Sequence, residues 1–387
     1  MKRRSIAGFL AVGFALMLLP ELRDTLNYPR YLLSFLYFVF FWIALATSWN
    51  ILTGYSGYFS FGHGAFYGIG VYTTANIVTK TDLSFLVTLP LAGVLAALVG
   101  LVVGLVVFRL RQLRGELFAL LTLAVDFVVA ALARNVDFID GGLGHSLGRV
   151  DYPEFLGAFP DMMYRVGLVI ALLTVFVAYL VYSSRLGRGL FAIHDDEAVA
   201  EGLGVPTFRF KLIAFGISAF FAGLAGGLHA VQISYVTVEG VFTLTVPLFV
   251  ILISLLGGRR HWLGPAIGAI IIYTLNDVFS DTSLRFLNEI AIGGLLIVII
   301  LFMPEGIYER LRSRIVPAAI LATIVTIIQV AFSGGRITEQ AAVTMLCVIA
   351  LLMIPAWLYN RYIGRYILPR GARASARGAV AETGSGE

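Results

Sequence analysis

Residues 31–53 read YLLSFLYFVFFWIALATSWNILT, an unbroken run without a charged side chain. A helix needs about 20 apolar residues to cross the hydrocarbon core of a bilayer, so this run alone predicts a transmembrane helix. It is too long and too uniformly apolar for a tilted strand of a membrane β-barrel, in which polar and apolar residues alternate. The run therefore predicts an all-α membrane protein.

The rest of the chain has the same character. Of its 387 residues 59% are hydrophobic and 13% are charged, and the mean hydropathy is +0.90. A soluble domain carries about a quarter charged residues. We therefore expect a polytopic bundle of about 10–12 transmembrane helices in the cell membrane. The expected spans lie at 6–20, 31–53, 57–78, 84–108, 116–133, 165–183, 209–232, 240–256, 262–280, 285–303, 315–332 and 341–359.

The basic residues predict the orientation of this bundle. With a cytoplasmic N-terminus, 20 of the 28 Lys and Arg residues fall in inside connections, as the positive-inside rule requires. The same rule explains the net charge of +5, so we expect membrane lipid and no nucleic acid as a partner. The start, MKRRSIAGFLAVGFALMLLP, resembles a signal peptide, but no small-x-small cleavage site follows. We expect an uncleaved first span, with a cleaved signal as the alternative.

The chain lacks the motifs of a catalyst. It has no G-x-x-x-x-G-K-[ST] segment to hold the phosphates of ATP. Its five histidines are scattered, and none forms a metal-ligand pair at helical spacing. We therefore expect no catalytic residues, no metal and no cofactor.

Residues 183–207, SSRLGRGLFAIHDDEAVAEGLGVPT, predict a short helix in an inside loop, with both of its ends marked. Asp195 or its neighbour can cap the first N–H groups, and Asp196 and Glu197 suit the positive end of the helix dipole. Gly204 can adopt the left-handed conformation that closes a helix, and a proline follows. Such a helix is either a rigid knob that a partner protein grips or a linker that lies along the membrane surface.

Two further places carry candidate functional residues. Residues 56–72, SGYFSFGHGAFYGIGVY, combine five glycines with one histidine, and Gly62 and Gly64 leave His63 room to point into the bundle. His63 either contacts a solute or makes a buried hydrogen bond that fixes the turn, which the orientation places at 54–57. Asp126, inside a span, either lines a path or relays protons, or pairs with a polar neighbour within the bundle.

Both motifs resemble one family, the branched-chain amino acid ABC transporter permeases of the LivM type. The resemblance covers residues 31–306. In the inside loop and the span after it, the matching residues are Arg188, Asp195, Asp196, Glu197, Ala200, Glu201, Gly204, Lys211 and Leu212. In the glycine-rich stretch they are Ser60, Gly62, His63, Ala65, Phe66, Gly70 and Tyr72.

The resemblance implies a permease subunit of an ATP-driven importer. Its inside loop would be the coupling helix, docked on cytoplasmic ATPase subunits that bind the ATP. A sister permease subunit and an extracytoplasmic solute-binding protein would complete the assembly, and the solute would be a branched-chain or other amphipathic amino acid. The expected coupling-loop residues are Arg188, Asp195, Asp196, Glu197, Ala200, Glu201 and Gly204. The expected residues of the translocation path are Ser60, Gly62, His63, Gly64 and Asp126.

The chain departs from the family at its end. Family members usually stop soon after a Pro-Glu-Gly such as residues 304–306, whereas this chain continues for 81 residues. We therefore expect a permease domain at 1–306, additional membrane helices at 307–369 and a disordered cytoplasmic tail at 370–387.

Other functions remain open from the sequence. An importer of urea or a short amide belongs to the same superfamily. An ion-coupled secondary transporter needs charged or unwound sites near the membrane midplane, for which Asp126 is the candidate, but it has no use for a coupling helix. A membrane-embedded enzyme is disfavoured because no catalytic groups are clustered.

Overall fold

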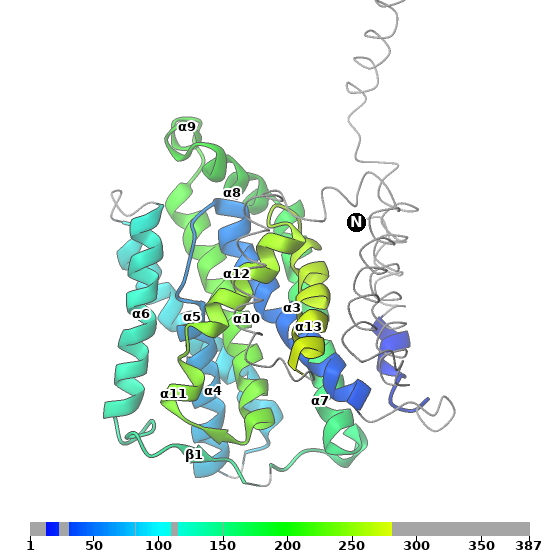
Figure 1. The fold of residues 1–387 in the computed structure, drawn as a ribbon. Coiled ribbons are helices and arrows are strands. Elements are labelled where there is room, and N and C mark those ends of the chain that lie inside the picture. Colours follow the sequence, from blue (N-terminus) through cyan, green and yellow to red (C-terminus); the bar gives the residue numbers. More distant parts are fainter. Residues whose placement is uncertain (1–12, 23–30, 82, 110–114, 149, 281–387) are drawn as a thin grey trace, which may run out of the picture.

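The computed structural model describes residues 13–22, 31–81, 83–109, 115–148 and 150–280, and over these it confirms the all-α membrane bundle (Figure 1). The bundle contains both long and shorter helices. Among the shorter ones are α4 (His63–Lys80), α11 (Val238–Val241), α12 (Thr245–Gly257) and α13 (Gly264–Ser280). Helices α11 and α12 both lie within the run Val238–Gly257. In the described part of the chain, six helical stretches are long and apolar enough to cross a membrane: α3 (Tyr31–Ser56), α5 (Phe85–Val107), α6 (Glu116–Asn135), α7 (Phe159–Ser183), α10 (Thr207–Ile233) and Val238–Gly257.

Several expectations fall outside the described residues. These are the spans expected at 285–303, 315–332 and 341–359, the tail at 370–387, and most of the span at 6–20.

The bundle has two distinct ends. At one end the chain between α7 and α10 forms α8 (Arg185–Asp195) and α9 (Glu197–Gly202), which stand above the bundle in Figure 1. At the other end β1 (His145–Ser146) pairs antiparallel with β2 (Tyr235–Val236), and a 3-10 turn (Glu154–Leu156) precedes α7. We call these the α9 end and the β end.

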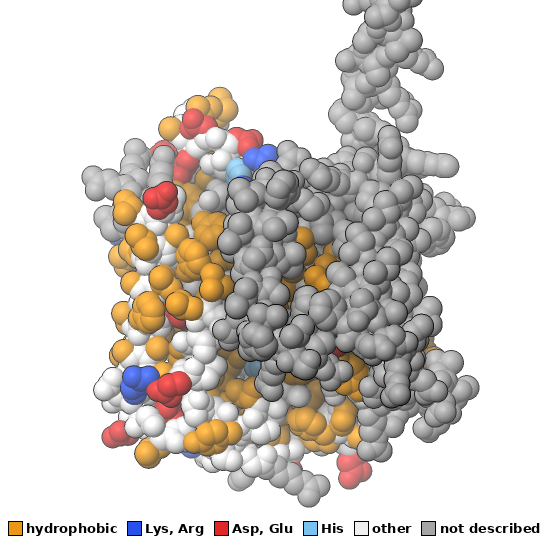
Figure 2. Space-filling view, viewed as in Figure 1, with side chains coloured by type: hydrophobic (Ala, Val, Ile, Leu, Met, Phe, Trp, Pro, Cys, Tyr) orange, Lys and Arg blue, Asp and Glu red, His pale blue; other side chains and the backbone are white. Residues whose placement is uncertain are grey.

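Helix α10 lies in the centre of the bundle because glycines let its neighbours approach closely. Gly223 of α10 meets Gly70 of α4 backbone to backbone, and Gly226 lies against the carbonyl of Tyr67. On its other side α10 packs on Ala92 and Ala96 of α5. Helices in lipid gain nothing from hiding apolar surface, so close backbone packing must hold them together. The outward faces of α5 and α6 stay apolar and exposed, as the orange side chains in Figure 2 show for α6.

The structure corrects the sequence-based boundary between the second and third spans. We expected a turn at 54–57 and a span from 57, but α3 continues to Ser56 and α4 begins only at His63. Gly57, with φ +75°, ends α3. Residues 57–62 then run without helical structure from the end of α3 into the bundle, where α4 begins (Figure 1).

The helical stretch Val238–Gly257 is also interrupted. We expected one helix at 240–256, but residues 242–244 separate α11 from α12. The 13 residues of α12 extend about 20 Å at 1.5 Å per residue, which is less than the roughly 30 Å of hydrocarbon. Helix α12 alone is therefore too short to cross the hydrocarbon.

Candidate functional site

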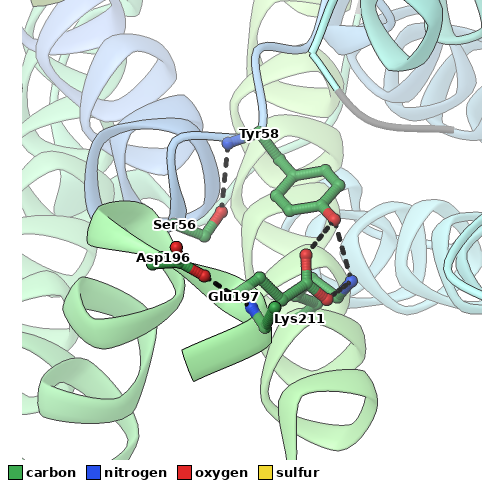
Figure 3. Close-up of polar contacts among 6 residues, drawn as sticks. Ser56, Tyr58, Asp196, Glu197 and Lys211 are labelled. Carbon is green, nitrogen blue, oxygen red and sulfur yellow. Dashed lines mark hydrogen bonds and ion pairs between the residues drawn. The ribbon is translucent and has the colours of Figure 1, made fainter. Parts of the chain in front are cut away.

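Three buried side chains from three segments meet at the α9 end, as Figure 3 shows: Tyr58, Glu197 and Lys211. Nζ of Lys211 lies 2.6 Å from Oε1 of Glu197 and donates to the Tyr58 hydroxyl at 3.0 Å. The Tyr58 hydroxyl in turn donates to Oε2 of Glu197 at 2.5 Å. The cluster ties the first residue of α9 to α10 and to the segment 57–62. We call these three residues the latch.

Aromatic rings close the latch off from water. Nζ of Lys211 lies 4.5 Å from the ring centroid of Tyr58 and 5.2 Å from that of Phe108. The Tyr58 ring meets Phe108 and Phe118 edge to face. The ring faces attract the ammonium, and the dry surroundings make a complete ion pair strong and an incomplete one costly.

The latch was only partly visible in the sequence. Glu197 was expected as a residue of the coupling loop, but its side chain is buried within the protein, and no role was expected for Tyr58. Lys211 did carry a signal, since it lies four residues inside the apolar run of α10. A lysine at such a position calls for a partner.

Helix α9 has the two ends that the sequence predicts. Its cap is Asp196, whose carboxylate accepts from the N–H groups of Ala198 at 2.8 Å and Val199 at 3.0 Å. At its other end Gly204 has φ +86°. The loop differs from the expectation because it forms two helices. Asp196 has an extended backbone conformation, which interrupts the helical structure between α8 and α9.

The other coupling-loop candidates take different positions. Arg188 lies within α8, where it donates to the Ser183 carbonyl, and Ala200 is buried. Asp195 forms a 3.2 Å ion pair with Arg260, but both side chains are more than half exposed, so the pair adds little stability. Glu201 is exposed.

The free surface of α9 is unexpectedly apolar. Val199 is 58% exposed and Leu203, just after the helix, is 80% exposed. Exposed apolar side chains of this kind are typical of a surface that contacts another protein or lies along the membrane surface.

His194, near the end of α8, lies against the turn that ends α3. A Cβ on Gly57 would come within 2.9 Å of its Nδ1, and that Nδ1 has no hydrogen-bond partner among the described residues. Burial lowers the pKa of His194, and Arg260 and Arg259 lower it further against the opposing effect of Asp195. The imidazole is therefore neutral at pH 7.

Side chains of α3 and α6 hold the segment 57–62 in place. Trp49 donates from Nε1 to the Ser60 carbonyl at 2.7 Å, and the Phe61 N–H donates to Oγ1 of Thr122 at 3.0 Å. Oγ of Ser60 accepts from the Gly62 N–H at 3.3 Å. Non-helical backbone is tolerated inside a membrane where its polar groups are satisfied in this way.

His63, the first residue of α4, is anchored to α3. Its Nε2 lies 2.8 Å from Oγ of Ser48, whose hydroxyl donates to the Leu45 carbonyl at 2.7 Å. A hydroxyl that donates elsewhere accepts from the imidazole, which places the proton of His63 on Nε2. The structure thus shows the buried hydrogen bond that was one of the two roles expected for His63.

The start of α4 lies deep in the bundle. Ser48 precedes the end of α3 by eight residues, so His63 begins α4 about 12 Å below that end. A Cβ on Gly64 would lie 2.8 Å from Oδ1 of Asp126, which is near the middle of α6. The structure therefore brings the five path candidates together at one place: Ser60, Gly62, His63, Gly64 and Asp126.

Asp126 itself has an unusual environment. It is 1% exposed, and its Oδ1 has no hydrogen-bond partner among the described residues. Pairing with a polar neighbour was one of the alternatives expected from the sequence, and for Oδ1 the structure shows none. The segment 57–62 connects this acid to the latch, because it contains Tyr58 at one end and adjoins α4 at the other.

These features define the class of protein: a multi-pass membrane protein with a short capped helix held at one end of an apolar bundle. The chain belongs to the family described as branched-chain amino acid transport system / permease component, whose profile matches residues 31–303. The family resemblance of the two sequence motifs is thereby confirmed.

Individual relatives agree with this assignment. The chain is 32% identical over 299 residues to the high-affinity branched-chain amino acid transport system permease protein LivM of Escherichia coli. The aligned region covers 71% of this chain and 69% of that relative. It is 25% identical over 262 residues to a probable branched-chain amino acid transport permease protein LivH of Methanocaldococcus jannaschii, covering 64% and 82%. It is 29% identical over 224 residues to an autoinducer 2 import system permease protein LsrC of Klebsiella pneumoniae, covering 57% and 63%. No solved structure matches the chain.

Proposed function

We propose that the chain is the permease subunit of an ATP-driven importer of branched-chain amino acids, and that the α9 end is the site on which a cytoplasmic ATPase subunit docks. The family and the relatives support the transport system and its solute. The single observation that carries the docking site is the latch. The latch fixes α9 to the bundle, because Glu197 of α9 is bonded both to Lys211 of α10 and to Tyr58 of the segment 57–62. A force applied to α9 would therefore be transmitted to both of these elements.

The surface of α9 has the chemistry of a docking site. Val199 and Leu203 are exposed apolar side chains, and the same loop also exposes the carboxylates of Asp195 and Glu201. A partner groove with an apolar floor and basic rims fits this pattern. We infer the remaining partners, a sister permease subunit and an extracytoplasmic solute-binding protein, from the family and from its LivM and LivH relatives.

Docking is tested by replacing Leu203 with glutamate. The charge would be buried without a partner in the ATPase groove, so we expect the ATPase subunits to be lost when the tagged permease is purified from membranes. Leu143→Glu is the matched control, because Leu143 is 85% exposed at the β end. The control should retain the ATPase subunits. If Leu203→Glu also retains them, α9 is not the docking site.

The solute is tested separately. Reconstituted importer should take up radiolabelled leucine, and excess valine or isoleucine should compete for uptake while excess urea should not. Competition by urea alone would assign the importer to short amides and would leave the docking site unaffected.

A further inference from the structure

The strongest unexplained group inside the bundle is the Asp126 carboxylate. A carboxylate at membrane depth is costly unless it is paired, and such groups in transporters mark the paths of ions and solutes. In this protein Oδ1 has no partner among the described residues, although the residue is 1% exposed. Oδ1 points at Gly64, where the absence of a side chain leaves the carboxylate next to the first turn of α4.

The first turn of α4 adjoins this acid. Gly62, the N-cap of α4, has no side chain with which to cap the helix, and the Gly62 N–H itself donates to Oγ of Ser60. The leading N–H groups of any helix lack partners within it, and the N-terminus carries a partial positive charge. In α4, which has 18 residues, this end lies inside the bundle rather than in water. A buried acid and a buried helix N-terminus thus lie side by side.

An apolar surface completes the arrangement. Gly68, four residues after Gly64 on the same face of α4, contacts the ring of Phe242. Phe242 belongs to the interruption between α11 and α12, and its ring stacks on Tyr72 at 5.9 Å between centroids. Interrupted helices at membrane depth form the solute sites of many transporters. An apolar side chain of a solute would lie against this ring.

We propose that these groups form a subsite for a zwitterionic amino acid with an apolar side chain. The Asp126 carboxylate accepts hydrogen bonds from the solute's ammonium group. The N–H groups of the first turn of α4 face the solute's carboxylate, and Phe242 contacts the solute's side chain. The proposal rests on the proposed function, since it requires an amino acid as the solute. It adds where and how the permease itself recognises that solute.

The subsite is closed in this structure. Asp126 is sealed from solvent, and the segment 57–62 lies beside it, with Phe61 bonded to Thr122 one turn before the acid on α6. The same segment carries Tyr58 of the latch. A movement of α9 would therefore be passed to the segment that precedes α4 and packs on α6 next to Asp126, which gives ATP-driven motion a way to open the subsite.

The first test measures transport by the complete importer, with its binding protein and ATPase subunits, in proteoliposomes. We expect Asp126→Asn to lower the leucine taken up per ATP hydrolysed by roughly tenfold or more, the loss for one charge-assisted hydrogen bond. Asp126→Glu should retain more of the coupling than Asp126→Asn, because it keeps the charge. Asp140→Asn is the control, since Asp140 is also a buried acid with an unpartnered Oδ1 but lies toward the β end. Wild-type coupling in Asp126→Asn overturns the proposal.

The second test needs no variant, so a folding defect cannot obscure it. During ATP turnover, the permease–ATPase complex is treated with a carbodiimide, and labelling of Asp126 and Asp140 is measured by mass spectrometry. Leucine should slow the labelling of Asp126 but not of Asp140. 4-Methylpentanoate, which is leucine without the amino group, should slow neither. Equal labelling with and without leucine, or equal protection by both compounds, overturns the ammonium contact.

These outcomes separate the subsite from the proposed function. If the unmutated importer transports leucine but both tests fail, the subsite is wrong and the proposed function stands. If the unmutated importer does not transport leucine at all, the proposed function fails first.

Discussion

Glu197, the first residue of α9, and Lys211 of α10 form an ion pair of 2.6 Å whose side chains are 8% and 4% exposed. A buried pair of this kind contributes little net stability compared with well-packed apolar residues, but removing one partner leaves a charge stranded in a dry site. The pair is therefore better suited to transmitting position than to stabilising the fold. It fixes where α9 stands relative to the central helix.

The first prediction concerns the two charges. Lys211→Met alone, or Glu197→Gln alone, should each destabilise the α9 end, by about 3–5 kcal/mol when a full charge is stranded. The double variant should cost less than the sum of the two, because no unpaired charge remains. Hydrogen exchange over residues 196–211 measures the effect. Strictly additive losses would show that the two side chains do not act as a pair.

The second prediction separates the cap from the charge of Asp196. Asp196→Ala removes the acceptor for two N–H groups and should cost about 1 kcal/mol, which appears as faster hydrogen exchange at Ala198 and Val199. Asp196→Asn should exchange as the wild type does, since asparagine caps equally well. Should the asparagine variant lose ATPase binding while its exchange is unchanged, the charge of Asp196 contacts the partner directly.

The third prediction compares two glycines at the same end. Gly57→Ala combines the strain of φ +75° with a contact of 2.9 Å to His194, and it should cost at least about 1–2 kcal/mol. Gly202→Ala meets nothing within 4 Å and should be neutral or stabilising by about 0.5–1 kcal/mol. Thermal unfolding in detergent measures both. A neutral Gly57→Ala would mean that α3 does not end at a fixed turn.

The fourth prediction concerns pH. The pKa of His194 is lowered in the folded protein, so near its usual value of 6.5 the unfolded chain binds the proton more readily. The packing of His194 therefore contributes fully above about pH 6.5 and is lost as the pH falls from there through the folded pKa. Thermal unfolding between pH 8 and pH 5 should show this loss, and His194→Gln should remove that part of it. An unchanged pH profile in the glutamine variant would exclude His194 as its source.

Much of the fold can be predicted from the sequence because each membrane-spanning helix corresponds to a long run of apolar residues. The runs at 31–53, 84–108 and 116–133 agree with α3, α5 and α6 to within a few residues. The failures occur where the chain leaves the helix inside the bundle. Residues 57–62 are as apolar as the residues of a membrane-spanning helix, so the sequence does not reveal that they are non-helical. Their hydrogen bonds to Trp49 and Thr122 explain why the backbone can remain non-helical inside the bundle.

The candidate site divides in the same way. The cap at Asp196 and the turn at Gly204 depend on local backbone chemistry, and sequence alone predicts both. The latch joins residues 58, 197 and 211, and no local pattern reveals a contact across 139 positions. Asp126 was recognisable as an ionisable residue within a span, and Gly64 as a glycine of the same expected path, but no pattern in the sequence placed the two side by side. Their juxtaposition required the structure.

The close packing of α10 has a consequence for the whole molecule. A helix of 27 residues is a stiff rod about 40 Å long, and at Gly70 and Gly223 its backbone lies in direct contact with that of α4. A tilt of about 5° about Lys211 would carry the opposite tip, about 33 Å away, by roughly 3 Å. That tip leads directly into β2, which is paired with β1. Helix α10 thus begins beside the α9 end, where an ATPase would dock, and ends at the strand pair of the β end. This one rigid helix therefore connects the two faces of the membrane.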